Sequence, residues 1–171
     1  DEDSVLDATD QGINYTVLTN DDDPDDDDLT VVGFNGTSSL TGDTAKGASV
    51  ELFADGTFTY DPTNASTLQA LGVGDPPESD TFTYTVSDGF GGEDEAMVTI
   101  LVTAVNDPPV AENDLFKGPR NTPLPIDVLE NDEDVDSPTA DLDVILMDEP
   151  DASLGTLTFN NLTKEFTFTP G

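Results

Sequence analysis

The sequence predicts an all-β protein made of two tandem β-sandwiches, the second of which is incomplete at its C-terminus. Three observations predict this fold class. Apolar and polar residues alternate with a period of two over many short segments, as in half-buried strands. Turn-forming Gly, Asp and Pro residues separate these segments. The sequence also aligns with itself when residues 14–21 are placed on residues 125–132, which indicates a repeated module.

The strands expected in the first copy are rich in Val, Thr, Phe and Tyr, which strands favour. We expect them at residues 13–18, 29–34, 48–53, 57–60, 81–86 and 95–103. Their core-facing side chains should be Val50, Leu52, Phe58, Tyr60, Phe82, Tyr84 and Val86. Asp55-Gly56 predicts a tight hairpin turn, and residues 87–92 predict a second turn between strands. Strands this short and this regularly spaced indicate an immunoglobulin-like sandwich, for which about 105 residues is a usual size.

Two further segments are irregular in this pattern. Residues 66–71 predict one helical turn, ended by Gly72. The stretch Asn106-Asp107-Pro108-Pro109 predicts a short, semi-rigid linker, because two consecutive prolines hold the chain extended. We therefore expect one complete domain at residues 1–105 and a second, truncated domain at residues 106–171.

The second copy lacks a counterpart of residues 63–105, which hold the last two strands of the first copy. In a sandwich those strands lie in the middle of one sheet. Their absence should expose four side chains, Leu157, Phe159, Phe166 and Phe168. Either the sequence is a fragment, or a neighbouring chain supplies the strands by strand addition.

Composition excludes several classes of function. The 171 residues include 38 acidic and 4 basic ones, a formal net charge of −34, so nucleic acid and anionic membranes would be repelled. No Cys or His occurs, which excludes disulfides, zinc sites, thiol nucleophiles and imidazole-based catalysis. No apolar run is long enough to cross a bilayer. Disorder is the competing explanation for so acidic a chain, but the period-two pattern argues against it.

An acidic stretch occurs in each copy, VLTNDDDPDDDD at residues 17–28 and VLENDEDVD at residues 128–136. Each has an apolar run before it and another after it, at residues 29–32 and 142–145, so the simplest interpretation is strand, acidic loop, strand. Closely spaced carboxylates repel one another unless water, salt or a cation screens them. Calcium is the hard cation that prefers such oxygen ligands. The alternative interpretation is a solvated acidic turn.

The chain contains a set of motifs that are weak singly and specific together: the stretch TFTYTVSDG at residues 81–89, the pair Gly91-Gly92, the strand at 96–100, VNDPP at 105–109, ADGTFTY at 54–60 and the Asp-rich stretch. Together these motifs resemble those of bacterial cadherin-like and VCBS-type repeats. The resemblance covers one complete repeat and most of another. It implies Greek-key sandwiches in a calcium-rigidified tandem array, within a large extracellular adhesin or matrix protein at the bacterial cell surface. The partners it implies are adjacent repeats, and neighbouring chains through strand addition or homophilic contact.

The resemblance also implies which residues hold calcium, because cadherins bind it at domain junctions. Asn106 and Asp107 match the linker ligands, while Asp132 and Asp134 match the DxD motif of the following domain. Asp10 falls near the acidic position of the first strand. Asp21, Asp23 and Asp88 would form the upper half of a preceding junction.

Three departures from the cadherin pattern predict fewer ions at each junction. Pro108-Pro109 follow the linker directly. No acidic-Arg-Glu motif precedes residue 81, although Glu78 and Asp80 lie there. In the second copy Asn121 takes the place of Asp10.

The favoured function is therefore a calcium-stiffened spacer or adhesion repeat. One alternative is a carbohydrate-binding module of a secreted, polysaccharide-associated protein. The chain has no Trp, however, and Phe34, Phe53 and Phe90 are interpreted as packing residues. An enzyme is not expected, since acids recurring at a loop and a linker fit structural ion binding better than one catalytic cleft. Adaptation to saline water, with few ions bound specifically, is a further alternative.

Overall fold

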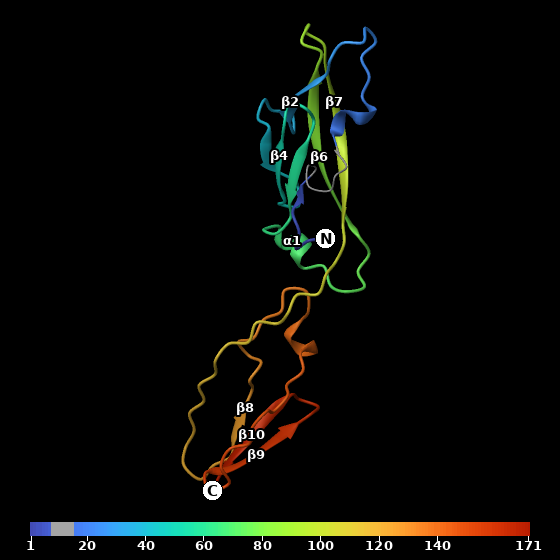
Figure 1. Ribbon diagram of the computed structural model, residues 1–171. Coiled ribbons are helices and arrows are strands. Elements are labelled where there is room, and N and C mark those ends of the chain that lie inside the picture. Colours follow the sequence, from blue (N-terminus) through green and yellow to red (C-terminus); the bar gives the residue numbers. More distant parts are fainter. Residues whose placement is uncertain (8–15) are drawn as a thin grey trace. The chain divides into compact units, whose positions relative to one another are not determined.

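The computed structural model describes residues 1–7 and 16–171, which form two compact units (Figure 1). Unit 1 is Asp1–Asn106 and unit 2 is Asp107–Gly171. Nearly all of the regular structure is antiparallel β-sheet, so the predicted all-β class is confirmed. Among the described residues, no helix is both long enough and apolar enough to span a membrane.

Unit 1 is a sandwich of two sheets. One sheet has the strand order β1-β5-β4-β3 and the other has the order β2-β6-β7. The strands are β1 (Leu6–Asp7), β2 (Thr30–Phe34), β3 (Thr41–Asp43), β4 (Ser49–Leu52), β5 (Phe58–Asp61), β6 (Glu78–Ser87) and β7 (Glu93–Val102). A single helical turn, α1 (Ser66–Gln69), follows β5. Five predicted strands and the predicted helical turn are thus found, while β1 and β3 were not predicted.

The core of unit 1 lies between the two sheets, where β6 closes the sandwich. The ring of Phe82 on β6 lies 5.7 Å from those of both Phe34 and Phe58, so it bridges the two layers. Six of the seven predicted core residues are buried, and Val86 is partly buried against them. Burying aromatic and aliphatic surface in this way is the main stabilising term for the unit.

The segment before the first acidic loop is not the predicted strand. Residues 13–15 lie outside the described residues, and Val17–Asn20 form a 3-10 helix, η1. The hydroxyl of Thr16 accepts a hydrogen bond from the Leu18 amide at 3.3 Å and so caps this helix. Gly56, at the β4–β5 turn with φ +82°, lies against η1 and accepts the Val17 amide hydrogen bond at 2.9 Å. A Cβ at residue 56 would collide with the Thr16 and Leu18 side chains, so this packing depends on glycine.

Unit 2 contains one three-stranded sheet with the order β8-β10-β9. Its strands are β8 (Leu124–Ile126), β9 (Gly155–Asn160) and β10 (Glu165–Pro170), and a short 3-10 helix, η2 (Thr139–Asp141), precedes β9. Among its described residues, only Leu129 and Phe166 are buried hydrophobic side chains. Unit 2 therefore has a much smaller core than unit 1.

The exposure predicted for unit 2 is correct only in part. Phe159 is 38% exposed, whereas Leu157 and Phe168 are half-buried. The prediction is wrong for Phe166, which is 5% exposed because it lies on the central strand with its ring 4.7 Å from that of Phe159. The strand predicted at residues 142–145 is also absent. Its counterpart β2 is held by pairing with β6, and unit 2 has no such partner strand.

Two aromatic residues interpreted as packing residues are on the surface instead. Phe90, at the β6–β7 turn, is 82% exposed, and Phe53, at the end of β4, is 41% exposed. Phe34 is buried as expected. Both exposed rings lie at turns, where the period-two pattern that identifies core residues no longer applies.

Candidate metal-binding site

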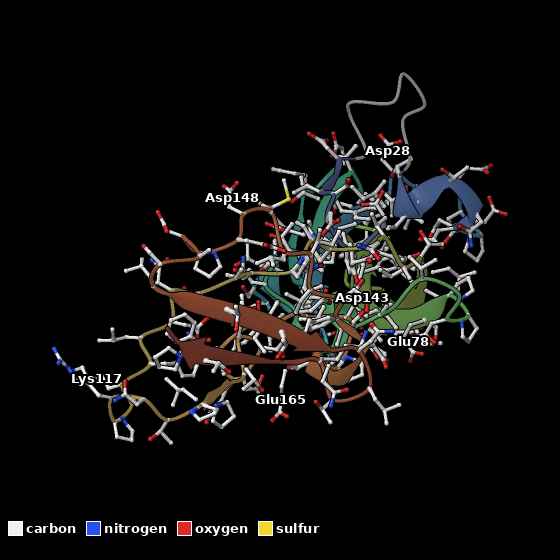
Figure 2. The ribbon with its side chains drawn as sticks, turned by 90° about the horizontal axis from the view of Figure 1, so that it is seen from below. Asp28, Glu78, Lys117, Asp143, Asp148 and Glu165 are labelled. Carbon is white, nitrogen blue, oxygen red and sulfur yellow. The ribbon has the colours of Figure 1, made fainter. Side chains whose placement is uncertain are left out.

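The acidic loop of unit 1 is folded around Asp23. One carboxylate oxygen of Asp23 accepts hydrogen bonds from the amides of Asp25, at 2.8 Å, and Asp27, at 3.3 Å. Asp26 has a φ of +61°, which an Asp adopts more easily than most residues. The loop therefore curls around one carboxylate before the chain enters β2. Asp28, near the end of this loop, is labelled in Figure 2.

Asp21 is held by a tyrosine on β6, Tyr84. The Tyr84 hydroxyl on β6 lies 2.8 and 3.0 Å from the two carboxylate oxygens of Asp21 and 3.0 Å from the Val17 carbonyl oxygen. Burial raises the pKa of Tyr84, and the hydrogen bond to Asp21 raises it further. Tyr84 therefore stays protonated, able to donate its proton and to fix Asp21 at the start of the loop.

Asp88 lies in the turn between β6 and β7. One of its carboxylate oxygens accepts hydrogen bonds from the Phe90 amide at 2.7 Å and the Gly92 amide at 2.9 Å. These backbone donors, that of Phe90 above all, lower the pKa of Asp88. The predicted residues Asp21, Asp23 and Asp88 all line one open cavity of about 510 Å³, together with Asp22, Glu93, Asp94 and Glu95.

The acidic loop of unit 2 repeats the turn seen in unit 1. A carboxylate oxygen of Asp134 accepts the amides of Asp136, at 3.2 Å, and Ser137, at 2.9 Å. In unit 1, Asp23 contacts Asp25 in the same way. The Asp-x-Asp spacing thus specifies the same local turn in both copies, because a carboxylate readily accepts the amide two residues ahead.

Asp107 joins this second loop. Its amide donates to a carboxylate oxygen of Asp136 at 3.2 Å, and the Glu112 amide donates to Asp132 at 2.9 Å. Three of the predicted residues of unit 2, Asp107, Asp132 and Asp134, therefore lie in or against one loop. Asn106 belongs to unit 1.

Asp134 and Asp136 are close enough to perturb each other. A hydrogen bond between their side chains raises the pKa of Asp134 and lowers that of Asp136. Two carboxylates within hydrogen-bonding distance repel each other when both are ionised, so a proton or a cation between them is favourable. Among the described residues, however, no group of three or more acidic side chains is arranged so that it could hold a metal ion.

Glu2 is a site residue that the sequence did not reveal. It is fully buried, and one carboxylate oxygen accepts the Val105 amide while its backbone carbonyl accepts the Gln69 side-chain amide at 2.6 Å. The other carboxylate oxygen, Oε2, finds no hydrogen-bond partner among the described residues. Glu2 thus contacts the strand end that leads into Asn106. Asp10, the residue expected for this role, lies outside the described residues.

The acids that precede residue 81 have structural partners. Asp80 is 2% exposed, and one of its oxygens accepts hydroxyl hydrogen bonds from Thr44 at 2.5 Å and Tyr60 at 2.9 Å. Glu78 forms an ion pair with Lys46. Both acids are therefore committed to holding β6 in place.

Comparison with known families gives two matches, one for each of units 1 and 2. The profile of the bacterial cadherin-like domain matches residues 1–104. The chain belongs to the bacterial cadherin-like family. In this cadherin-like chain, a second profile, that of a bacterial Ig domain, matches residues 106–171. Searches of curated proteins and of solved structures gave no match. Domains of these two kinds are typically extracellular structural or adhesion modules rather than enzymes.

Proposed function

We propose that this chain is part of a calcium-binding, calcium-rigidified spacer or adhesion repeat in a large bacterial surface, adhesin or matrix protein. Family membership supports an extracellular adhesion repeat. The excess of acidic side chains supports a cation as the stabilising partner, because a net charge of −34 opposes a compact fold through self-repulsion. The carboxylate-rich loop of each unit supplies the hard oxygen donors that calcium prefers.

The observation that carries this proposal is the buried carboxylate of Glu2. Its Oε1 is held by the Val105 amide, yet its Oε2 is buried without a hydrogen bond from any described residue. A buried carboxylate oxygen in this state is costly unless a cation compensates its charge. Oxygen is the ligand atom that calcium takes, so the donor chemistry of Glu2 fits the ion.

Asp107, Asp134 and Asp136 are the corresponding candidates in unit 2. The carboxylates of Asp134 and Asp136 repel each other when both are ionised, and the Asp107 amide donates a hydrogen bond to Asp136. When bound, calcium would supply the positive charge that this pair needs, with backbone carbonyls and water completing six to eight ligands. Since Pro108 and Pro109 already restrict the backbone, fixing Asp107 would leave few freely rotating bonds in the linker.

A calcium titration by calorimetry tests the proposal. The native chain should bind calcium saturably at about millimolar concentration or below, the range of extracellular calcium modules. Glu2→Gln keeps an oxygen for the Val105 amide but removes the charge, so it should weaken at least one binding event about ten-fold. Glu51→Gln, an exposed change of equal charge on β4, is the matched control and should bind as the native chain does.

Two results would contradict the proposal. Absence of saturable binding at millimolar calcium would remove the calcium-dependent function altogether. Equal weakening by Glu2→Gln and Glu51→Gln would mean that calcium is held only as a diffuse counter-ion, which is the behaviour expected of an acidic surface adapted to saline water.

The carbohydrate-binding hypothesis stays a prediction. Phe53 and Phe90 are its aromatic candidates, since both are exposed. Glycan binding that survived Asp107→Asn but was lost in Phe90→Ala would favour it over the spacer function.

A further inference from the structure

Four stretches of the chain have the form Asn-x-Ser/Thr, the sequence that enzymes recognise when they attach a sugar to asparagine. They are Asn14-Tyr15-Thr16, Asn35-Gly36-Thr37, Asn64-Ala65-Ser66 and Asn161-Leu162-Thr163, and none has proline in the middle. Attachment also needs an exposed segment on which the asparagine amide and the hydroxyl two residues later can both be reached. Asn14 lies outside the described residues. The structure decides which of the other three acceptor triplets can be used.

The Asn35 triplet is closed by hydrogen bonds, although it is on the surface. The Asn35 side chain accepts the Thr83 amide at 2.8 Å through Oδ1, and its Nδ2 donates to the Asp43 carbonyl oxygen at 3.5 Å. The Thr37 hydroxyl donates to the Phe34 carbonyl oxygen at 2.9 Å. Both groups that an enzyme must contact are thus engaged with the fold, so modification here requires breaking these bonds first.

The Asn64 triplet is fixed in the turn before α1. Its middle residue, Ala65, is 1% exposed and belongs to the core of unit 1. The Ala65 amide donates to the Pro62 carbonyl oxygen at 2.8 Å, and the Ala65 carbonyl oxygen accepts the Leu68 amide at 2.8 Å. This triplet cannot extend into the active site of an enzyme unless the turn and α1 open first.

The Asn161 triplet is the open one. It lies in the turn between β9 and β10, where all three of its residues are exposed and Leu162 is 92% exposed. The preceding residue fixes this turn, because Asn160 Oδ1 accepts the Leu162 amide at 3.0 Å and the Thr163 amide at 3.4 Å. Within the described part of the chain, the side chains of Asn161 and Thr163 form no hydrogen bond. The amide and the hydroxyl of this triplet are therefore both available.

The surroundings of Asn161 also suit an anionic sugar donor. Activated sugars carry a diphosphate, which a chain of net charge −34 repels. Residues 152–164, by contrast, contain no acidic side chain. The charged residue among them, Lys164, is paired with Asp143. The Asn161 triplet therefore lies on a stretch of the chain where this repulsion is reduced.

We propose that Asn161 is the attachment site of an N-linked sugar. In the transfer, Asn161 Nδ2 bonds to the anomeric carbon of the donor and gives up one proton to a base of the transferring enzyme. The bond from that carbon to the diphosphate oxygen breaks, and the diphosphate leaves with the electron pair. The donor is a sugar diphosphate carried by a nucleotide or by a lipid, and the Thr163 hydroxyl marks the triplet for the enzyme. This inference is independent of calcium binding.

The first experiment treats the folded chain with two enzymes specific for Asn-x-Ser/Thr. One transfers glucose from a nucleotide diphosphate and the other transfers an oligosaccharide from a lipid diphosphate, so the mass added identifies the donor. Peptide mass spectrometry measures the modified fraction of each asparagine. Asn161 should be modified at least about ten-fold more than Asn35, because Asn35 must first lose two side-chain hydrogen bonds. In synthetic peptides of the same triplets, which lack the fold, this difference should disappear.

Two variants test whether Asn161 is recognised through its triplet. Thr163→Ala removes the hydroxyl and should abolish modification of Asn161, whereas Thr163→Ser keeps a hydroxyl and should retain it. Both changes are at an exposed residue whose side chain holds no other part of the fold, so unit 2 should fold in each.

The second experiment applies the same mass spectrometry to the protein isolated from the cells that make it, where the Asn161 peptide should carry the sugar. An unmodified Asn161 peptide from these cells would overturn the inference. So would a folded chain that neither enzyme modifies at Asn161, or one that they modify preferentially at Asn35 or Asn64. Modification of Thr163→Ala to the native extent would show that Asn161 is not read as part of a triplet, which also contradicts the inference.

Discussion

The two hairpins β4–β5 and β9–β10 share one register but not one environment. In unit 1 the second sheet covers the hairpin and every core-facing side chain on it is buried. In unit 2 the same pattern of alternating residues builds the same hairpin, yet Phe159 is exposed and the buried residues are few. The comparison shows that local alternation is enough to pair two strands, whereas a core requires strands from distant sequence.

The largest expected effect is the difference in stability lost when equivalent positions of the two hairpins are replaced by alanine. Leu52→Ala should lower the free energy of unfolding of unit 1 by about 2–5 kcal/mol, because it leaves a cavity in a covered core. Phe159→Ala, at the matching position of unit 2, should cost less than about 1.5 kcal/mol, since its site is already open to water. Denaturant unfolding followed by amide signals of each unit measures both. Equal losses would show that unit 2 has a covered core after all.

The second-largest expected effect is a difference between the two units in how alkaline pH changes their stability. Tyr60 and Tyr84 have pKa values raised above the ordinary 10.0, first by burial and then by hydrogen bonds to Asp80 and Asp21. The folded state therefore holds both phenolic protons more tightly than the unfolded state does. This stabilisation is complete below about pH 10 and is lost as the pH rises towards the folded-state pKa.

Unit 2 contains no tyrosine, so unit 1 alone should lose this source of stability as the pH rises past about 10. Phenolate absorbance, together with the free energy of unfolding of each unit followed by its amide signals, checks this. Tyr60→Phe should make unit 1 less sensitive to alkali while weakening it at neutral pH by about 1–2 kcal/mol, through loss of the hydrogen bond to Asp80. An equal loss of stability in both units would contradict this prediction.

The smallest expected effect is a difference between the two acidic loops in the pH at which acid weakens calcium binding. Asp134 has a raised pKa because of Asp136, whereas backbone donors lower the pKa of Asp88. Asp134 therefore takes up a proton at higher pH than Asp88 does, and a proton there competes with a cation. As the pH falls towards the ordinary aspartate pKa of 3.8, calcium binding at the unit 2 loop should therefore fall before binding at the unit 1 cavity.

Carboxylate chemical shifts, measured with and without calcium, follow the two sites separately. Asp134→Asn removes the proton competition and should leave the unit 2 loop with weak binding that no longer varies as the pH falls. Asp23→Asn is the matched change in unit 1. Loss of calcium from the Asp88 cavity first would be the opposite of the predicted order.

Much of unit 1 follows from local sequence. Alternation located β2, β4, β5, β6 and β7, and the Asp-Gly pair located the hairpin turn. The misassigned segments have physical causes. Val17 and Leu18 resemble the end of a strand, but the Thr16 cap and the contact with Gly56 turn them into a 3-10 helix. Residues 142–145 have strand composition, but a strand also needs a partner.

The candidate site was predictable to a lesser extent. Repetition of the Asp-x-Asp spacing identified the two acidic loops, because a turn built on one carboxylate depends only on adjacent residues. Glu2 depends on Val105, 103 residues away in sequence, so no local pattern identifies it. Its role depends on which chain segments meet at the end of unit 1, which composition and spacing do not encode.

The central claim is that calcium restricts motion between the two units. Because the native chain has no cysteine, Ser38→Cys and Leu162→Cys place one spin label on an exposed loop of each unit. Pulsed electron paramagnetic resonance then gives the distribution of distances between the labels. The account predicts a narrow distribution with calcium that broadens when a chelator is added. A distribution of the same width in both conditions would contradict it.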